Sequence, residues 1–133
     1  MSTLSERLLG SDQNVFLLDG GTGEELFRRG VPDDRKLWSA TAIVHSEHHG
    51  VLEEVHKSFL QAGAQAITTN SYGIIPGVGF DNDSERQTYL DMAGSIARRA
   101  VTASGKKDVM VLGSLGPLVE SYRADLIRSH AQG

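Results

Sequence analysis

The sequence has 133 residues, which is long enough for one domain with a hydrophobic core and too short for two. Hydrophobic residues make up 39% and charged residues 23% of the chain, as in ordinary soluble globular proteins. The formal net charge is −4 and no basic stripe is visible, which argues against a protein that binds the phosphate backbone of nucleic acids.

Membrane and secreted classes are also not expected. No stretch approaches the roughly 18 apolar residues that cross a bilayer, and residues 1–14 lack the apolar segment of a secretory signal. We therefore expect a cytoplasmic protein without a membrane partner. The sequence contains no cysteine, which excludes disulfides, thiol catalysis and thiolate metal ligands within this chain.

The first predicted elements are a strand and a short helix. Residues 15–18 are an apolar run, typical of a strand buried on both faces, and the run ends at Asp19. Thr22 and Glu25 have the spacing of a capping box, in which two side chains cap the first turn of a helix. A helix is therefore expected to begin there and to stop at Gly30.

A longer helix and a second strand follow. Apolar residues at helical spacing predict a helix over residues 46–62, and Gly63 occupies the position just after the helix end, where glycine is favoured. Residues 66–69 predict a strand that ends at Asn70. Residues 71–83 are predicted to form a loop because of their glycine and proline content.

The last predicted elements repeat this order. Ser84 and Gln87 again have capping-box spacing, and the helix that they begin is expected to end near Gly105. Residues 109–112 predict a third apolar strand. Residues 121–133 are typical of the start of another helix.

The alternation of strands and helices predicts an α/β fold. Such alternation implies parallel strands joined by right-handed crossovers, within a single domain over residues 1–133. An open doubly wound sheet and part of a closed (β/α) barrel both satisfy the pattern. The pattern alone does not separate these two architectures.

Polar side chains with flexible backbone follow each predicted strand. Asp19, Gly20 and Gly21 follow the first strand, Asn70 the second and Ser114 the third. In both architectures ligands bind where parallel strands end, so these five residues are the candidate substrate-binding residues. Asp19 can accept hydrogen bonds from an ammonium group, and the glycines allow close approach of the backbone. The alternative is that the segments are ordinary turns and that Asp19 only caps the helix after it.

Four segments resemble one protein family. They are LDGGTGEELFRRG, LWSA, HKSFLQAGAQAITTNSYG and VLGSLGPLVESYRADL, and they follow one another from about Val15 to Leu126. In this order and spacing they resemble the homocysteine S-methyltransferase family. The resemblance implies a (β/α)8 TIM barrel, of which this chain would form the N-terminal part with about three β/α units. It also implies methyl transfer from an onium donor to the sulfur of L-homocysteine, which gives methionine.

The resemblance also implies roles for single residues. Asp19 matches the aspartate that holds the amino group of homocysteine, Gly20 and Gly21 match the glycines beside it, and Asn70 lies at the mouth of the second strand. Family members hold homocysteine as a thiolate on zinc, bound by three cysteines late in the chain. These ligands have no counterpart here, so we expect a truncated domain that has no metal-binding or catalytic residue of its own and is inactive alone.

Other interpretations remain open. The GGTG segment at residues 20–23 resembles a phosphate-binding loop and would suit a nucleotide-binding module. Exposed strand edges would allow a non-catalytic barrel fragment to associate with another chain or with itself. His45 and His49 are spaced i, i+4 and could share a metal on a helix face, although this helix leads away from the strand ends. The sequence does not select the methyl donor.

Overall fold

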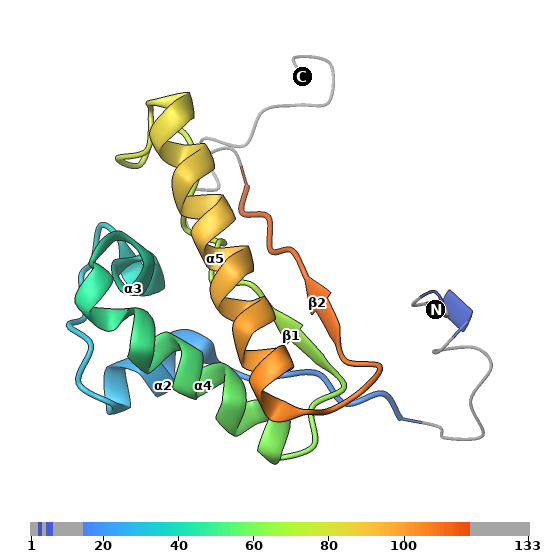
Figure 1. Cartoon of the computed structure of the whole chain (residues 1–133). Coiled ribbons are helices and arrows are strands. Elements are labelled where there is room, and N and C mark those ends of the chain that lie inside the picture. Colours follow the sequence, from blue (N-terminus) through green and yellow to red (C-terminus); the bar gives the residue numbers. More distant parts are fainter. Residues whose placement is uncertain (1–2, 4, 7–14, 118–133) are drawn as a thin grey trace.

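Two parallel strands form a small sheet at one side of the fold (Figure 1). The computed structural model describes residues 3, 5, 6 and 15–117, so the helix expected at residues 121–133 lies outside the described part. Strand β1 (Ala66–Thr68) pairs with β2 (Met110–Leu112), with Ala66 opposite Met110. The predicted α/β class and the parallel direction of these strands are confirmed, because helix α5 (Asp83–Ser104) connects them as a crossover.

The strand predicted at residues 15–18 is reduced to a single parallel bridge between Leu18 and Ala66. The backbone of Leu17 adds two hydrogen bonds to Gln65, one to its amide N–H at 2.8 Å and one to its side-chain oxygen at 2.9 Å. The expected burial on both faces is wrong, since Val15 is 72% exposed and Leu18 is 52% exposed. Burial on both faces requires helices on both sides of the sheet. Helices α4 (His49–Gln61) and α5 cover the same side of β1 and β2, so the other side is not covered by them (Figure 1).

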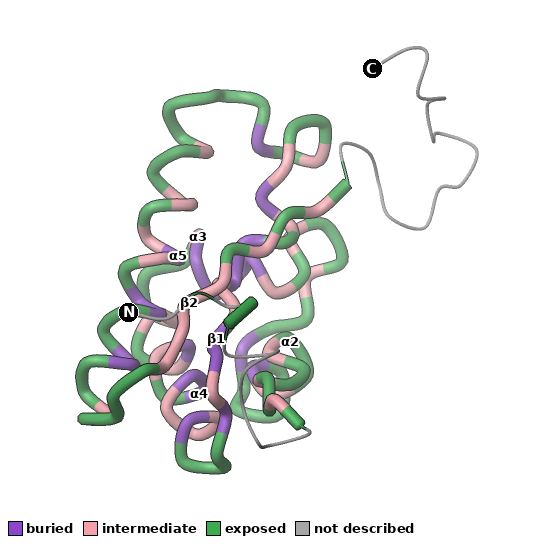
Figure 2. Tube along the Cα trace, turned by 90° about the vertical axis from the view of Figure 1, so that its right-hand side faces the viewer, coloured by how far each residue is buried: buried purple, intermediate pink, exposed green. Residues whose placement is uncertain are grey.

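Helices α4 and α5 pack side by side, and the apolar spacing explains why. Leu52, Val55 and Leu60 face inward on α4 and are fully buried. On α5 the inward face is made of small residues and isoleucine, which lets the two helices approach closely. Figure 2 faces the strands and shows both helices behind them. The buried residues of α5 are Ala93, Ile96, Ala97, Ala100 and Val101.

The helix ends differ in detail from the predicted capping boxes. Helix α2 (Thr22–Arg28) has Gly21 as its N-cap without a side-chain cap, and Glu25 instead pairs with Arg29 at 2.9 Å. Helix α5 begins earlier than expected, because the Asn82 side chain accepts a hydrogen bond from the Glu85 amide at 3.0 Å. The predicted glycine stops are confirmed at three helix ends, where the backbone has positive φ, namely at Gly30, Gly63 and Gly105.

A short helical segment before α4 was not predicted. It consists of η1 (Trp38–Ala40) and α3 (Thr41–Val44). The helix predicted over residues 46–62 corresponds to η2 (Ser46–His48) followed by α4. Ala40, Ala42 and Ile43 are buried against the helices, so tertiary packing holds these short turns.

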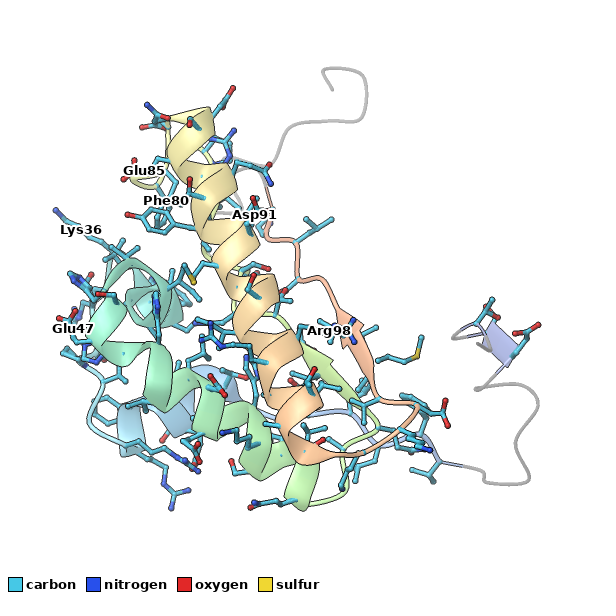
Figure 3. The ribbon with its side chains drawn as sticks, viewed as in Figure 1. Lys36, Glu47, Phe80, Glu85, Asp91 and Arg98 are labelled. Carbon is cyan, nitrogen blue, oxygen red and sulfur yellow. The ribbon has the colours of Figure 1, made fainter. Side chains whose placement is uncertain are left out.

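The core consists of two clusters of buried side chains. One joins α2, α3, α4 and the N-terminal half of α5, beside which Phe80 lies (Figure 3). Phe80 packs edge to face on Tyr89 with ring centres 5.7 Å apart. The other packs Ile67 of β1 against Leu60 of α4 and Val101 of α5. Each such buried side chain contributes about 1.5–3 kcal/mol. None of the helices that the structure describes has the length and apolar character needed to cross a membrane.

Candidate functional site

Asp19 is anchored at the end of the first strand by a residue of the second. Its Oδ2 accepts a hydrogen bond from the Thr68 amide at 2.8 Å, and its Oδ1 accepts one from the Thr68 hydroxyl at 2.9 Å. Asp19 is half-buried, and it makes no salt bridge with any cation in the described part of the chain. The carboxylate is therefore held in place without being neutralised.

A chain of hydroxyl groups joins the ends of β1 and β2. The Ser71 hydroxyl donates to the Ser114 carbonyl at 2.8 Å, and it lies 2.8 Å from the Thr69 hydroxyl. The Ser114 amide donates back to Thr69 Oγ1 at 3.2 Å. Because the Ser71 hydroxyl donates its proton to the Ser114 carbonyl, Thr69 must be the donor to Ser71. Each of the two hydroxyl groups then accepts one hydrogen bond and donates one. The two loops are thus fixed to each other.

The loop after β2 also approaches the loop after β1 through backbone. A Cβ atom added at Gly116 would collide with the Tyr72 carbonyl oxygen and come within 3.2 Å of Ile75. Glycine is therefore required for this contact. Together with the hydroxyl ring, the contact places Ser114 beside the end of β1.

Asn70 lies at the end of β1 and is only 6% exposed. Its Nδ2 donates to the Ser39 carbonyl at 2.7 Å, which ties η1 to the strand end. Asp19 is bonded to Thr68, and Ser114 is bonded to Thr69. Asp19, Asn70 and Ser114 therefore lie at the same end of the sheet. The amide of Asn70 already has a backbone partner, so its contact with a ligand remains a prediction.

The two glycines after Asp19 have different surroundings. A Cβ added at Gly20 would lie 3.0 Å from Cε1 of Phe59 on α4, whereas one at Gly21 would meet its nearest atom, Glu24 Cβ, at 3.8 Å. Packing against α4 is thus a sufficient reason for glycine at position 20. Gly21 is the N-cap of α2, and Glu24 and Glu25 follow in the first turn.

His56 is a buried histidine behind this site, on the inner face of α4. It is 0% exposed, and neither ring nitrogen has a hydrogen-bond partner in the described part of the structure. Burial lowers the pKa of His56 to about 4, while the charges of Asp19 and Glu53 oppose the shift. The ring is therefore neutral at pH 7 and leaves the negative charge of Asp19 uncompensated.

Zinc, which the resemblance implies, does not fit the residues of this chain. The sequence has no cysteine, and among the described residues no group of three His, Asp or Glu side chains could hold a metal ion. The i, i+4 histidines have other contacts. The ring centre of His45 lies 6.3 Å from that of His48, and Nε2 of His49 lies 2.8 Å from the Ile43 carbonyl oxygen.

A cavity of about 350 Å³ lies beside α2, next to the strand-end residues but not among them. Gly23, Trp38 and Ser39 form the wall nearest to the site, since the Ser39 carbonyl is the partner of Asn70. None of the five predicted site residues lines the cavity. The cavity therefore does not include the candidate substrate-binding residues. The remaining lining residues are Glu24, Leu26, Phe27, Val31, Pro32 and Asp33.

Thr68, Thr69 and Ser71 were not among the predicted site residues. Strand alternation was the available signal, because Ile67 packs on the helices and Thr68 must then face the other side, where Asp19 lies. His56 was also not among the predicted site residues, and two roles for a histidine on this helix are packing and capping. Its burial agrees with packing, whereas its unpartnered ring nitrogens do not agree with a cap.

The fold and the strand-end residues define an α/β protein with parallel strands and a polar site at their carboxyl ends. A sequence profile described as homocysteine S-methyltransferase matches residues 16–132. The chain belongs to the homocysteine S-methyltransferase family.

Individual relatives agree with this assignment. The homocysteine S-methyltransferase of Escherichia coli K12 is 33% identical over 128 residues, which cover 90% of this chain and 40% of that protein. The methionine synthase of Mycobacterium tuberculosis is 33% identical over 111 residues, which cover 79% of this chain and 9% of that protein.

A solved structure shows the same arrangement. The metallated form of the homocysteine methyltransferase MmuM from Escherichia coli matches with a TM-score of 0.76 at 30% identity, over 93% of this chain and 47% of that chain. The sequence thus spans less than half the length of these relatives.

Proposed function

We propose that this chain forms the homocysteine-binding part of a homocysteine S-methyltransferase, within a (β/α)8 barrel whose other units lie outside it. The carboxylate of Asp19 would receive the ammonium group of L-homocysteine. The single observation that carries this proposal is the anchoring of Asp19 by Thr68 at the same sheet end as Asn70 and Ser114. Membership in the family supports it.

The proposed reaction forms a bond between the homocysteine sulfur and a methyl carbon and breaks the bond between that carbon and the onium atom of the donor. Only the thiolate attacks carbon well, and a free thiol with a pKa near 8.5 is mostly protonated at neutral pH. Zinc bound by the cysteines that the family resemblance implies would hold the homocysteine sulfur as the thiolate. Since the residues of this chain do not fit zinc, we assign to them binding and orientation of the amino acid, and we expect no methyltransferase activity from the chain alone.

The proposed substrates are homocysteine and an onium methyl donor, both small molecules, in the cytoplasm. A nucleotide is a poorer match for the loop after the first strand. Helix α2 has Glu24 and Glu25 in its first turn, and Asp19 precedes it, so this helix start is acidic. Negative charge at this position opposes anion binding by the helix end.

Calorimetric titration of the chain with L-homocysteine, kept in its reduced thiol form, tests the proposal. We expect measurable binding that Asp19→Asn weakens by about tenfold or more, because a hydrogen bond to a charged group is worth about 1.5–3 kcal/mol. Asp33→Asn is the matched control on the α2 side and should leave the affinity unchanged. Equal affinity of the wild-type chain and the Asp19→Asn variant would overturn the proposed role of Asp19, and preferential binding of ATP would favour the nucleotide alternative.

Self-association is a second proposal, and the exposed apolar side chains beside β1 support it. Leu17 is 46% exposed and Leu18 is 52% exposed. Their segment pairs with β1 on one side, and its other side is a sheet edge. Such an edge can pair with the same edge of a second copy of the chain. Sedimentation velocity should show a concentration-dependent dimer that Leu18→Lys weakens. Phe27→Lys, an exposed apolar position on α2, is the control, and a monomer at all concentrations would refute the idea.

A further inference from the structure

Both carboxylate oxygens of Asp19 are held by one residue, Thr68, which is separated from Asp19 by 49 positions in the sequence. The backbone N–H of Thr68 binds Oδ2 and its hydroxyl binds Oδ1. We propose that Thr68 is a positioning residue, which fixes the Asp19 carboxylate in the one orientation that receives the ammonium group of the amino-acid substrate. This inference rests on the proposed function and adds a residue to it.

The hydrogen-bonding capacity of Asp19 permits this double role. An ionised carboxylate has about four lone-pair sites, and Thr68 occupies one on each oxygen. One lone pair on each oxygen is left for the donors of an ammonium group. Anchoring by Thr68 therefore orients the carboxylate without consuming its capacity to bind a ligand.

The chemistry of threonine suits this position in β1. Its branched side chain has a restricted χ1 angle in a strand, so its hydroxyl is held in one direction. The neighbouring Ile67 is buried against α4 and α5, and alternation along the strand turns Thr68 to the opposite face. Valine at position 68 would keep the shape and lose the hydroxyl, whereas serine would keep the hydroxyl with less restriction.

The charge of Asp19 is preserved by its surroundings. His56 lies behind the site but is neutral at pH 7, because burial lowers its pKa to about 4. Glu53, the other charged group near His56, is paired with Arg99 at 3.1 Å and Lys57 at 3.4 Å on the outer side of α4. Neither His56 nor the cations paired with Glu53 form a salt bridge with the Asp19 carboxylate.

Comparing two ligands separates a positioning role of Thr68 from an effect of Thr68 on the stability of the chain. L-homocysteine and 4-mercaptobutanoate, which lacks the amino group, are titrated by NMR into the wild-type chain, Thr68→Val and Thr68→Ser. The ratio of the two affinities is taken within each variant, so a partly unfolded fraction cancels. We expect the wild type to prefer homocysteine, Thr68→Val to reduce this preference by about threefold to tenfold, and Thr68→Ser to restore most of it.

A second measurement needs no ligand. Three-bond couplings from Asp19 N and C′ to its Cγ report the χ1 angle of Asp19. They should indicate one rotamer in the wild type and in Thr68→Ser, and averaging in Thr68→Val. Thr102→Val, at an exposed position near the end of α5, is the matched control and should leave both readouts unchanged.

The outcomes distinguish the inference from the proposed function. If the wild type shows no preference for the ligand with the amino group, the proposed function fails and the inference fails with it. If the wild type shows the preference and Thr68→Val retains it in full with a single Asp19 rotamer, only the positioning role of Thr68 is overturned.

Discussion

Gly20 lies directly against the ring of Phe59, so that a Cβ atom at position 20 would be 3.0 Å from Phe59 Cε1. This contact joins the loop that carries Asp19 to helix α4. The sequence presents the DGG segment as a ligand-binding signature, yet the structure gives its first glycine a packing role. A packing role for Gly20 predicts that its replacement lowers the stability of the chain even without a ligand.

Gly20→Ala should destabilise the chain by about 1 kcal/mol or more, because overpacking of a close contact forces side chains to move. Phe59→Leu should relieve part of this cost, which a double-mutant cycle in urea would detect as a coupling of at least about 0.5 kcal/mol. Gly94→Ala on α5, where a Cβ meets no atom within 4 Å, is the control and should instead stabilise by roughly 0.5–1 kcal/mol. Additive effects of the two substitutions would contradict the contact.

His56 predicts a specific dependence of stability on pH. The folded chain keeps the ring neutral down to about pH 4, whereas the unfolded chain takes up a proton near pH 6.5. Between these values the unfolded state binds more protons, so the stabilisation present above pH 6.5 is lost as the pH falls toward 4. The full loss is on the order of 3 kcal/mol, at about 1.4 kcal/mol per pH unit.

His56→Leu removes the titrating group and should flatten the free energy of unfolding between pH 6.5 and 5, measured by urea denaturation. The carboxyl groups with lowered pKa are Glu6, Asp34 and Glu53, and they are present in both proteins. His45→Gln, at an exposed histidine, should retain the wild-type slope. A slope in His56→Leu equal to that of the wild type would show that His56 is not buried as a neutral ring.

Asn70→Ala should destabilise the chain by about 1–3 kcal/mol, because it leaves the Ser39 carbonyl without its partner. The substitution should also alter the surroundings of Trp38, which is the neighbour of Ser39 and the sole tryptophan of the sequence. Its fluorescence maximum should shift in Asn70→Ala but not in Gln61→Ala, at an exposed position on α4. Unchanged stability with unchanged fluorescence would leave Asn70 free for a role in ligand binding alone.

Ser71→Ala interrupts the hydroxyl ring that fixes Ser114 to the end of β1. The Ser114 amide should then exchange with solvent about fivefold to tenfold faster, as expected for the loss of roughly 1 kcal/mol of local stability. Amide exchange measured by NMR gives this rate, and Ser95→Ala on the exposed side of α5 is the control. Equal exchange at Ser114 in both variants would show that backbone contact at Gly116 alone holds the loop.

The order of the main elements could be predicted from local signals. Apolar runs mark β1 and β2, and glycines with positive φ stop the helices at Gly30, Gly63 and Gly105. The turns over η1 and α3 could not be predicted, because they depend on burial of Ala40 and Ile43 against helices that lie far away in the sequence. The start of α5 was misplaced because Asn82 and Ser84 are both good N-caps, and only the structure shows which one is used.

The candidate site was predicted only in part, for a related reason. Asp19, Asn70 and Ser114 stand where strands end, and the position after a strand can be read from the sequence. Their partners Thr68 and Ser39 depend on which segments meet in space. The family resemblance supplied a role for Asp19 but not the residue that orients it.

The central claim is that L-homocysteine binds at the strand ends through Asp19. Titration of the ¹⁵N-labelled chain with L-homocysteine, followed by amide chemical shifts, tests it most directly. We predict that the largest shifts occur at Gly20, Gly21, Thr68 and Ser114 and that Asp19→Asn suppresses them. Shifts confined to Gly23, Phe27 and the Trp38 indole, which line the cavity beside α2, would contradict the claim.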